Sequence, residues 1–238
     1  MKYEVSIIFT LYNKECEIEE AVKQIHAYLR LQKMTHEFIL CNDGSSDSTL
    51  YKCEQMKHLY EHLKVLSYKN NIGRGYAVRL ATKQSMGNNI FYFDSDIVKT
   101  TPLKYITHAI ESLKDFDLLI ADRFNKENFF KRKFHRKIIS NIQRVLQKII
   151  FPEILDINDT EAGFKGGKSK VFKELVALTN ENRWGLDLEL ILLAKKHKYS
   201  ICQLPIQWNE KHEDYTSSVK FFRDIFLQCV LLVKLRFK

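Results

Sequence analysis

Two carboxylates one residue apart follow an apolar run near the middle of the chain. Asp94 and Asp96 come directly after residues 89–93. Side chains alternate across a β-strand, so residues i and i+2 project from the same face and can converge on one hard cation. Such a cation, Mg²⁺ or Mn²⁺, neutralises a diphosphate as it leaves a sugar or nucleotidyl group. The pair alone is also typical of a solvated turn after a strand, so its neighbours decide between the two readings.

The elements that must position these carboxylates are short apolar strands that alternate with helices. Strands are predicted at residues 5–9, 37–41, 64–67, 90–93 and 118–121, and helices at residues 17–31 and 73–85. This alternation predicts an α/β fold with a mostly parallel central sheet flanked by helices. Ligands of such sheets bind beyond the carboxyl ends of the strands. Four polar segments should therefore meet around one crevice, at residues 10–15, 42–47, 70–75 and 94–96.

The chain of 238 residues is long enough for one large domain, and no linker rich in proline, glycine or serine divides it. It also has no internal repeat with a recognisable period. We predict a single domain over residues 1–238. Residues 1–98 are expected to form its nucleotide-binding half, residues 99–216 its acceptor half and residues 217–238 a C-terminal amphipathic helix.

Composition bears on where the protein works and on what it binds. Its five cysteines are an odd number without metal-ligand spacing, which favours reduced thiols in the cytoplasm. The first residues lack the apolar core of a signal peptide, and no run approaches the ~20 apolar residues that span a bilayer. A formal net charge of +9 points to an anionic partner, whether nucleic acid, anionic lipid or a phosphorylated substrate. No zinc-finger, helix-turn-helix or RNA-binding signature is present, so we expect no nucleic-acid partner.

Six segments, in order along the chain, resemble motifs of the family 2 glycosyltransferases, which have the Rossmann-like GT-A fold. Residues 8–15 are similar to Ile-Pro-x-Tyr-Asn-Glu, residues 42–49 to Asp-Asp-Gly-Ser-x-Asp-x-Thr, residues 71–77 to Asn-x-Gly-Lys-Gly-x-Ala and residues 94–96 to Asp-x-Asp. Residues 159–165 resemble Asp-Thr-x-x-Gly-Phe-Lys and residues 183–190 resemble Phe-Asp-x-Glu-Leu, both from the polyprenyl-phosphate (dolichyl-phosphate) branch. Each motif is common alone, but their shared order and spacing are specific.

The resemblance implies a donor site for a nucleotide-diphospho-sugar. Asp94 and Asp96 would hold Mg²⁺ or Mn²⁺ against the diphosphate, and Asp96 counts among the catalytic residues. The residues that would bind the nucleotide itself are Thr10, Tyr12, Asn13, Glu15, Asp43, Gly73 and Arg74. The structural alternatives are a turn residue for Asp43, an aromatic packed over the sheet edge for Tyr12 and a solvated cation for Arg74.

The same resemblance implies a polyprenyl phosphate as acceptor, with Arg123 and Arg136 as the cations that hold its phosphate. Guanidinium groups suit this role because they bind phosphate in a bidentate geometry. Such a phosphate is already an anionic nucleophile at neutral pH, so no strong general base is needed. In the alternative, Arg123 pairs structurally with Asp122 or Asp117.

A sugar hydroxyl in a cell-surface glycan is the second candidate acceptor, and it would need a carboxylate base. Asp187 is the first choice for this base and Glu189 the second. Residues two apart on a helix face different ways, so only one of the two should point into the site. Both acceptors predict single displacement with inversion, as in the family.

Several positions depart from the family pattern. Thr10 replaces the usual proline, and Asn42 replaces the first of two aspartates. Val98 stands where dolichyl-phosphate mannose synthases carry a glutamine ligand, which predicts weaker metal affinity. Residues 159–165 and 187–190 look closer to the dolichyl-phosphate glucosyltransferases, so UDP-glucose is the expected donor and GDP-mannose the alternative.

Two segments, residues 129–150 and 217–238, combine an apolar stripe with lysines and arginines. Basic amphipathic helices of this kind lie in the membrane interface, which predicts a peripheral protein at the inner face of the cytoplasmic membrane. The alternative for each segment is a packed surface helix with a solvated basic face.

Two other functions are weighed against the glycosyltransferase. A nucleotidyltransferase also uses a Rossmann-like sheet with metal-binding acids, but the Gly-rich loop expected after its first strand is absent. A non-catalytic basic membrane-binding module would not need four polar loops converging on an Asp-x-Asp pair. The oligomeric state stays open, with a homodimer as one option.

Overall fold

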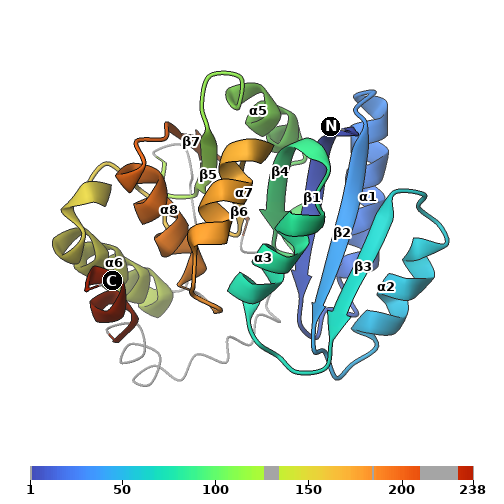
Figure 1. Cartoon of the computed structure of the whole chain (residues 1–238), viewed down its shortest axis with the longest axis horizontal. Coiled ribbons are helices and arrows are strands. Elements are labelled where there is room, and N and C mark those ends of the chain that lie inside the picture. The colour runs from blue at the N-terminus through green and yellow to red at the C-terminus, as the bar shows by residue number, and fades with distance from the viewer. Residues whose placement is uncertain (1, 126–133, 184, 210–229, 238) are drawn as a thin grey trace.

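A twisted β-sheet with helices on both faces forms the centre of the molecule (Figure 1). The computed structural model describes residues 2–125, 134–183, 185–209 and 230–237, and for residues 134–139 it describes the backbone alone. Within these residues the sheet has seven strands in the order β3-β2-β1-β4-β6-β5-β7.

The strands of this sheet run mostly parallel. They are β1 (Tyr3–Leu11), β2 (His36–Asp43), β3 (Leu63–Tyr68), β4 (Gly87–Phe93), β5 (Leu118–Asp122), β6 (Phe164–Lys168) and β7 (Ile201–Pro205). β1, β2, β3 and β4 share one direction, and β5 pairs with β7 in parallel. Only β6 among the described strands runs antiparallel to its neighbours, β4 and β5. The predicted α/β fold with a mostly parallel sheet is confirmed.

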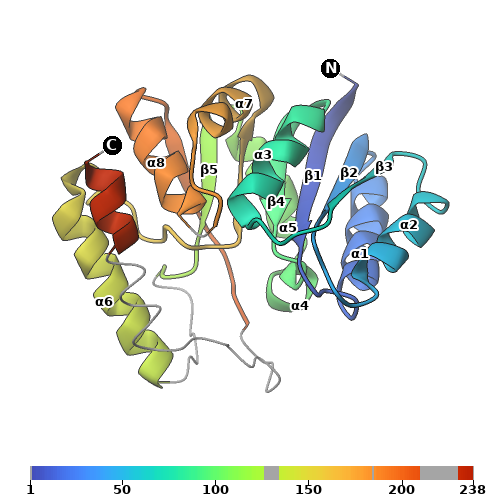
Figure 2. The same ribbon diagram turned by 60° about the horizontal axis from the view of Figure 1, so that its bottom comes forward.

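The helices cover the two faces of the sheet. They are α1 (Ile18–Leu31), α2 (Thr49–Lys57), α3 (Arg74–Gln84), α4 (Ile97–Thr100), α5 (Lys104–Ser112), α6 (Phe134–Ile150), the 3₁₀ turn η1 (Pro152–Ile154), α7 (Ser169–Leu178) and α8 (Leu186–Lys196). Residues 230–236 are also helical and are called the C-terminal helix here. It is drawn in dark red beside α6 in Figures 1 and 2.

Alternate residues of β1 pack into opposite helical layers, as the period of a strand requires. Ile7 and Phe9 belong to the core cluster that contains α1 and α5, whereas Ile8 belongs to the cluster that contains α3 and α7. A strand covered on both faces reads as a continuous apolar run, which is how β1 could be recognised in the sequence. A third cluster, around Phe151 and Leu232, joins α6, α8 and the C-terminal helix.

The parallel register brings the carboxyl ends of three strands to one edge of the sheet. Thr10 on β1 pairs with Cys41 on β2, and Phe9 pairs with Phe93 at the end of β4. The loops that follow these strands therefore start side by side, and Figure 2 turns this edge forward. Strands from both sides of residue 98 lie in the same sheet.

Strand β6 does not appear in the sequence prediction, and its glycines explain why. The sequence Phe-Lys-Gly-Gly-Lys has neither an apolar run nor an alternation of polar and apolar side chains. A side chain at Gly166 would collide with the ring of Phe91, so glycine lets β6 pack closely against β4. None of the described helices is both long and apolar enough to cross a membrane.

Candidate active site

The four polar segments expected at the carboxyl edge do meet there. The loop after β1 bonds to the loop after β2, since the Asn13 N–H donates to the Ser45 hydroxyl at 3.0 Å. The end of β2 bonds to the segment before α3 through Asp43. That segment in turn reaches the end of β4 through an ion pair of Arg74 with Asp94. The four segments that strand order predicts to meet are therefore connected to one another.

Asp43 anchors the segment between β3 and α3. Its carboxylate accepts hydrogen bonds from the N–H groups of Ile72 at 2.8 Å and Gly73 at 3.0 Å, and from the Asn71 side chain at 2.9 Å. Gly73 has φ 127°, a conformation that side-chain-bearing residues avoid. The Asn-x-Gly spacing thus serves to fold this segment onto Asp43, which is 4% exposed. A role for Asp43 in binding the base stays a prediction.

The loop after β1 presents its predicted nucleotide-binding residues in different ways. Asn13 and Glu15 use their side chains to hold the loop after β2, accepting from the N–H groups of Ser46 at 2.9 Å and Ser48 at 2.8 Å. Tyr12 is 48% exposed, and Thr10 is half-buried at the end of β1. Tyr12 is therefore the side chain of this loop with open surface for a ring of a ligand to cover.

Asp94 and Asp96 differ in their surroundings. The Asp94 side chain is 40% exposed, and its Oδ1 lies 3.3 Å from Arg74 Nη2. Asp96 is buried, and its Oδ1 has no hydrogen-bond partner. Burial and the charges of Asp94 and Glu17 raise the pKa of Asp96 to about 6. A buried carboxylate oxygen that lacks a partner and lies beside a second carboxylate suits a divalent cation.

The protein supplies only part of a coordination shell at this point. Across the described ranges, no group of three or more His, Cys, Asp or Glu side chains converges as a metal site. A cation held by Asp94 and Asp96 would need further oxygen ligands, and Mg²⁺ in phosphoryl sites takes these from phosphates and water. Val98, at the position of the missing glutamine, packs against the apolar core instead.

Gly163 fixes the position of Asp94. The carbonyl of Gly163 accepts the Asp94 N–H at 3.0 Å. A Cβ atom at residue 163 would overlap the carboxylate of Asp94. The glycine of the Asp-Thr-x-x-Gly-Phe-Lys segment is therefore needed for the close approach of this loop to the Asp-x-Asp pair.

Arg74 lies between two carboxylates. Its Nη2 faces Asp94, and its Nη1 lies 3.6 Å from Asp187 Oδ2. Its guanidinium also sits over the ring of Tyr92, 5.2 Å from the ring centroid. Asp187 and Asp94 raise the pKa of Arg74 above its ordinary value, against the effect of burial. The solvated-cation alternative does not describe Arg74, whose side chain is 19% exposed.

Asp187 and Glu189 point in different directions, as their spacing on α8 predicts. Asp187 is buried and accepts hydrogen bonds from the Tyr92 hydroxyl at 2.6 Å, with Lys165 Nζ at 2.7 Å from the same oxygen. Burial opposes ionisation, but the charges of Arg74 and Lys165 hold the pKa of Asp187 below its ordinary value. Glu189 instead accepts the N–H groups of Asn180 and Glu181, both at 2.9 Å.

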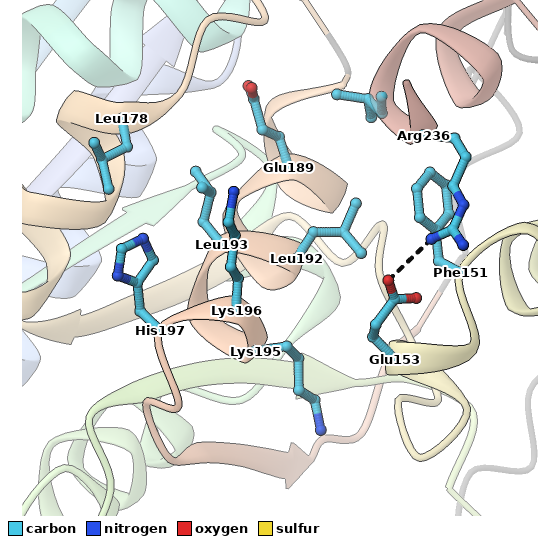
Figure 3. A pocket seen from close by; sticks show the side chains of 11 residues that line it. Phe151, Glu153, Leu178, Glu189, Leu192, Leu193, Lys195, Lys196, His197 and Arg236 are labelled. Atoms are coloured by element: carbon cyan, nitrogen blue, oxygen red, sulfur yellow. Dashed lines mark hydrogen bonds and ion pairs between the residues drawn. The ribbon is translucent and has the colours of Figure 1, made fainter. Parts of the chain in front are cut away.

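Glu189 also lines a pocket of about 660 Å³ between α8 and the C-terminal helix (Figure 3). Apolar walls come from Leu192, Leu193 and Phe151, and Arg236 forms an ion pair with a neighbouring glutamate on the rim. No residue of the Asp-x-Asp pair or of the loops after β1 and β2 lines this pocket. The pocket that Glu189 lines is therefore separate from the Asp-x-Asp pair and from these loops.

Arg123 forms an ion pair with Asp159 and not with Asp122 or Asp117, the partners named in the structural alternative. Arg123 Nε donates to Asp159 Oδ2 at 2.7 Å and Nη2 donates to Oδ1 at 3.0 Å. The guanidinium also lies 5.4 Å from the ring of Trp208. The signal for this pair was present in the Asp-Thr motif, to which no role had been assigned. Arg136 falls in α6, but its side chain lies outside the described residues.

Comparisons with known proteins agree with this geometry. A model of the family "Glycosyl transferase family 2" matches residues 6–176. A dolichyl-phosphate beta-glucosyltransferase of Drosophila melanogaster is 27% identical, over 94% of this chain and 74% of its own length. A dolichol-phosphate mannosyltransferase of Pyrococcus furiosus is 28% identical, over 84% of this chain and 55% of its own length. The chain thus spans about half to three quarters of the length of these two relatives.

Solved structures resemble the chain in fold. Glucosyl-3-phosphoglycerate synthase from Mycobacterium tuberculosis, in complex with Mn²⁺, UDP and glucosyl-3-phosphoglycerate, has a TM-score of 0.70 at 14% identity. The match covers 98% of this chain and 78% of that one. Mannosyl-3-phosphoglycerate synthase from Rubrobacter xylanophilus has a TM-score of 0.70 at 16% identity, covering 98% of this chain and 73% of that one. At these identities the likeness shows a shared glycosyltransferase fold.

Proposed function

The chain belongs to glycosyl transferase family 2, and we propose that it transfers glucose from UDP-glucose to a polyprenyl phosphate with inversion, using Mg²⁺ or Mn²⁺. GDP-mannose is the alternative donor. The observation that carries the proposal is the pair Asp94 and Asp96, with the unpartnered Asp96 oxygen and the Arg74 guanidinium at the same edge of the sheet. Dolichyl-phosphate glucosyltransferases among the relatives support the choice of sugar and acceptor.

The donor half of the reaction is a problem of neutralising charge on the leaving diphosphate. A divalent cation held by Asp94 and Asp96 would supply positive charge to the diphosphate oxygens. Arg74 adds a second positive charge from the protein itself, at a point 3.3 Å from Asp94. Tyr12, half-exposed in the loop after β1, offers a surface on which the nucleotide base can stack.

The acceptor half favours a phosphate over a sugar hydroxyl. A hydroxyl needs a base of matched pKa, and Asp187 has a lowered pKa with both oxygens facing positive groups. A phosphate nucleophile needs cations that hold it in line. Arg123 fits this need because Asp159 fixes its guanidinium beside Trp208. Arg136 remains the second proposed cation.

Attachment to the inner face of the membrane is the third element of the proposal. On α6 the exposed apolar residues are Ile142, Val145 and Ile149. On the C-terminal helix and the residue directly after it they are Val230, Val233 and Phe237. Both sets have the spacing i, i+3, i+7, which places each on one side of its helix. Apolar stripes on a chain with a net charge of +9 suit the interface of an anionic membrane.

A donor and acceptor panel tests the proposal. UDP-glucose, UDP-galactose, GDP-mannose and UDP-N-acetylglucosamine are each incubated with undecaprenyl phosphate or dolichyl phosphate, and release of UDP or GDP is followed. We expect nucleotide release from UDP-glucose that rises when a lipid phosphate is added. Release that rises with a glycan acceptor and not with either lipid phosphate would refute the acceptor, and release from GDP-mannose alone would refute the donor.

A further inference from the structure

A buried ionic cluster adjoins Arg74, and two of its members, Lys165 and Tyr92, have no part in the steps described so far. It consists of Lys165 on β6, Asp187 on α8 and Tyr92 on β4, with Arg74 at its edge. Lys165 is fully buried, donates to the Ala162 carbonyl at 2.5 Å and lies 2.7 Å from Asp187. Buried charges are costly unless they are paired and hydrogen-bonded. Lys165 and Asp187 are paired with each other and each has a further hydrogen bond, which makes the cluster a rigid support.

Arg74 differs from Lys165 and Asp187, because it forms ion pairs with the cluster but keeps nitrogen atoms that have no hydrogen-bond partner. Arg74 Nη1 lies 3.6 Å from Asp187 and Nη2 lies 3.3 Å from Asp94, both longer than a good charge-assisted hydrogen bond. Its Nε and Nη2 are buried without a hydrogen-bond partner. The guanidinium therefore keeps donors for an anion that enters beside Asp94.

Three backbone N–H groups around Arg74 are already bonded within the protein and are not available to such an anion. The first N–H groups of a helix commonly bind phosphate. In α3, the N–H groups of Gly75 and Tyr76 already donate to the Asn182 carbonyl at 2.7 and 3.2 Å, and the Gly73 N–H donates to Asp43. A side chain at Gly75 would collide with the loop that carries Asn182, so this closed start of α3 is built into the sequence. These three N–H groups cannot bind a phosphate at this point, which leaves the side chain of Arg74 as its charged donor.

We propose that Asp187, supported by Lys165 and Tyr92, is a positioning residue that holds the Arg74 guanidinium ready for the diphosphate of the donor. This inference rests on the proposed function, since it takes a nucleoside diphosphate as the ligand. Asp187 attracts the guanidinium, and Lys165 and Tyr92 fix the Asp187 carboxylate. The face of the Tyr92 ring also supports the guanidinium, whose central carbon lies 5.2 Å from the ring centroid. Asp187 thus acts through Arg74 and does not touch the acceptor.

The test compares ligands with and without the diphosphate. Calorimetric titration of UDP and of uridine, with GDP and guanosine as the second set, is carried out on the wild type, Asp187→Asn and Arg74→Ala. We expect UDP affinity to fall about tenfold to hundredfold in both variants, as for the loss of a charge-assisted contact, with uridine affinity unchanged. Glu37→Gln is the matched control, because Glu37 is a buried carboxylate paired with Lys64 at the opposite end of the strands.

Guanidinium rescue gives a second readout that a purely structural role would not produce. Millimolar guanidinium chloride should restore UDP affinity to Arg74→Ala, because the free ion can occupy the space between Asp94 and Asp187. It should fail to do so in the double variant Arg74→Ala/Asp187→Asn. Thermal unfolding establishes that each variant is folded. Tyr92→Phe is a milder variant, in which we expect UDP affinity to fall by less than in Asp187→Asn.

Each outcome of these experiments supports or refutes a stated part of the proposal. Equal losses for UDP and uridine in Asp187→Asn, an unchanged UDP affinity, or equal rescue with and without Asp187 would overturn the positioning role. A wild type that binds neither UDP nor GDP would refute the proposed function and this inference with it. Selective loss of UDP affinity, together with no sugar transfer to any polyprenyl phosphate, would refute the proposed acceptor and leave the role of Asp187 standing.

Discussion

Asp96 has a buried carboxylate oxygen without a hydrogen-bond partner. Such a group is costly to ionise, which is why its pKa rises to about 6 from an ordinary value of 3.8. Retaining an ionisable group where an amide would be cheaper is typical of a ligand site. The cost of this arrangement can be measured directly as a dependence of stability on pH.

In EDTA, Asp96→Asn should stabilise the protein above pH 6. A carboxyl group whose folded pKa is raised binds its proton more tightly in the folded state, so it destabilises the fold as pH rises from about 4 to about 6. Between pH 4 and pH 7, the variant should gain roughly 2 kcal/mol in free energy of unfolding relative to the wild type. Urea unfolding at the two pH values measures this, and a constant difference would show that Asp96 has no raised pKa.

Gly163→Ala should weaken metal binding with little loss of stability. The new methyl group would occupy the place of the Asp94 carboxylate, and that side chain is exposed enough to turn away. We expect the affinity for Mn²⁺ in the presence of UDP to fall about tenfold or more, measured by the electron paramagnetic resonance signal of free Mn²⁺. Gly166→Ala is the contrasting variant, because its methyl group would meet the Phe91 ring and should cost about 1–3 kcal/mol of stability. Unchanged Mn²⁺ affinity in Gly163→Ala would contradict the role of this glycine.

At the scale of elements, the sequence was informative where each strand has a clear pattern and a parallel neighbour. β1, β2 and β4 are apolar runs, and the rule for carboxyl ends then brought Asp43 and Asp94 to one edge without further information. β6 escaped notice because two of its five residues are glycine. With β6 unseen, the meeting of Lys165 with Asp187 could not be foreseen, since it depends on an antiparallel strand and a helix more than twenty residues later in the chain.

The pairing of Arg123 shows a second limit of the sequence. Asp122 and Asp117 are its near neighbours in the chain, whereas the actual partner, Asp159, comes from the loop before β6. Side-chain pairs between distant segments depend on the path of the backbone, which local patterns do not encode. The spacing of Asp187 and Glu189 was informative, because helical geometry alone separates their directions.

Glu189→Gln should act on stability and leave catalysis in place. Glu189 accepts two backbone N–H groups of the segment before α8, and its charge strengthens both bonds. Replacing the carboxylate should lower the free energy of unfolding by about 1–3 kcal/mol, as measured by urea unfolding. The pH dependence of kcat should match the wild type. A variant of normal stability that has lost turnover would identify Glu189 as a catalytic base after all.

At the scale of the whole molecule, two helices from distant parts of the chain join one core cluster while each keeps an exposed apolar stripe. Leu146 on α6 and Leu232 on the C-terminal helix pack in the same cluster. Ile149 and Val233 on the same helices stay exposed. Exposed apolar residues at helical spacing are typical of surfaces that meet a membrane or a partner.

Ile149→Glu should weaken binding to anionic vesicles. The Ile149 side chain is 69% exposed, so its replacement should leave the fold intact. Losing one buried aliphatic side chain from the interface should lower the partition coefficient about tenfold, measured by flotation with phosphatidylglycerol vesicles. Leu31→Glu on α1 is the matched control, since Leu31 is 79% exposed and does not belong to a row of exposed apolar residues on its helix. Equal binding by the two variants would argue against a membrane-facing α6.

The measurement closest to the central claim is transfer of radiolabelled glucose from UDP-glucose to undecaprenyl phosphate with Mn²⁺, counted in the organic phase. The wild type and Asp96→Asn are compared, with Asp156→Asn as a control, because Asp156 is an exposed carboxylate that pairs with Lys195. We predict lipid-extractable label that requires Mn²⁺, that disappears in Asp96→Asn and that persists in the control. Label that stays at background in the wild type, or that survives in Asp96→Asn, would contradict a metal-dependent polyprenyl-phosphate glucosyltransferase.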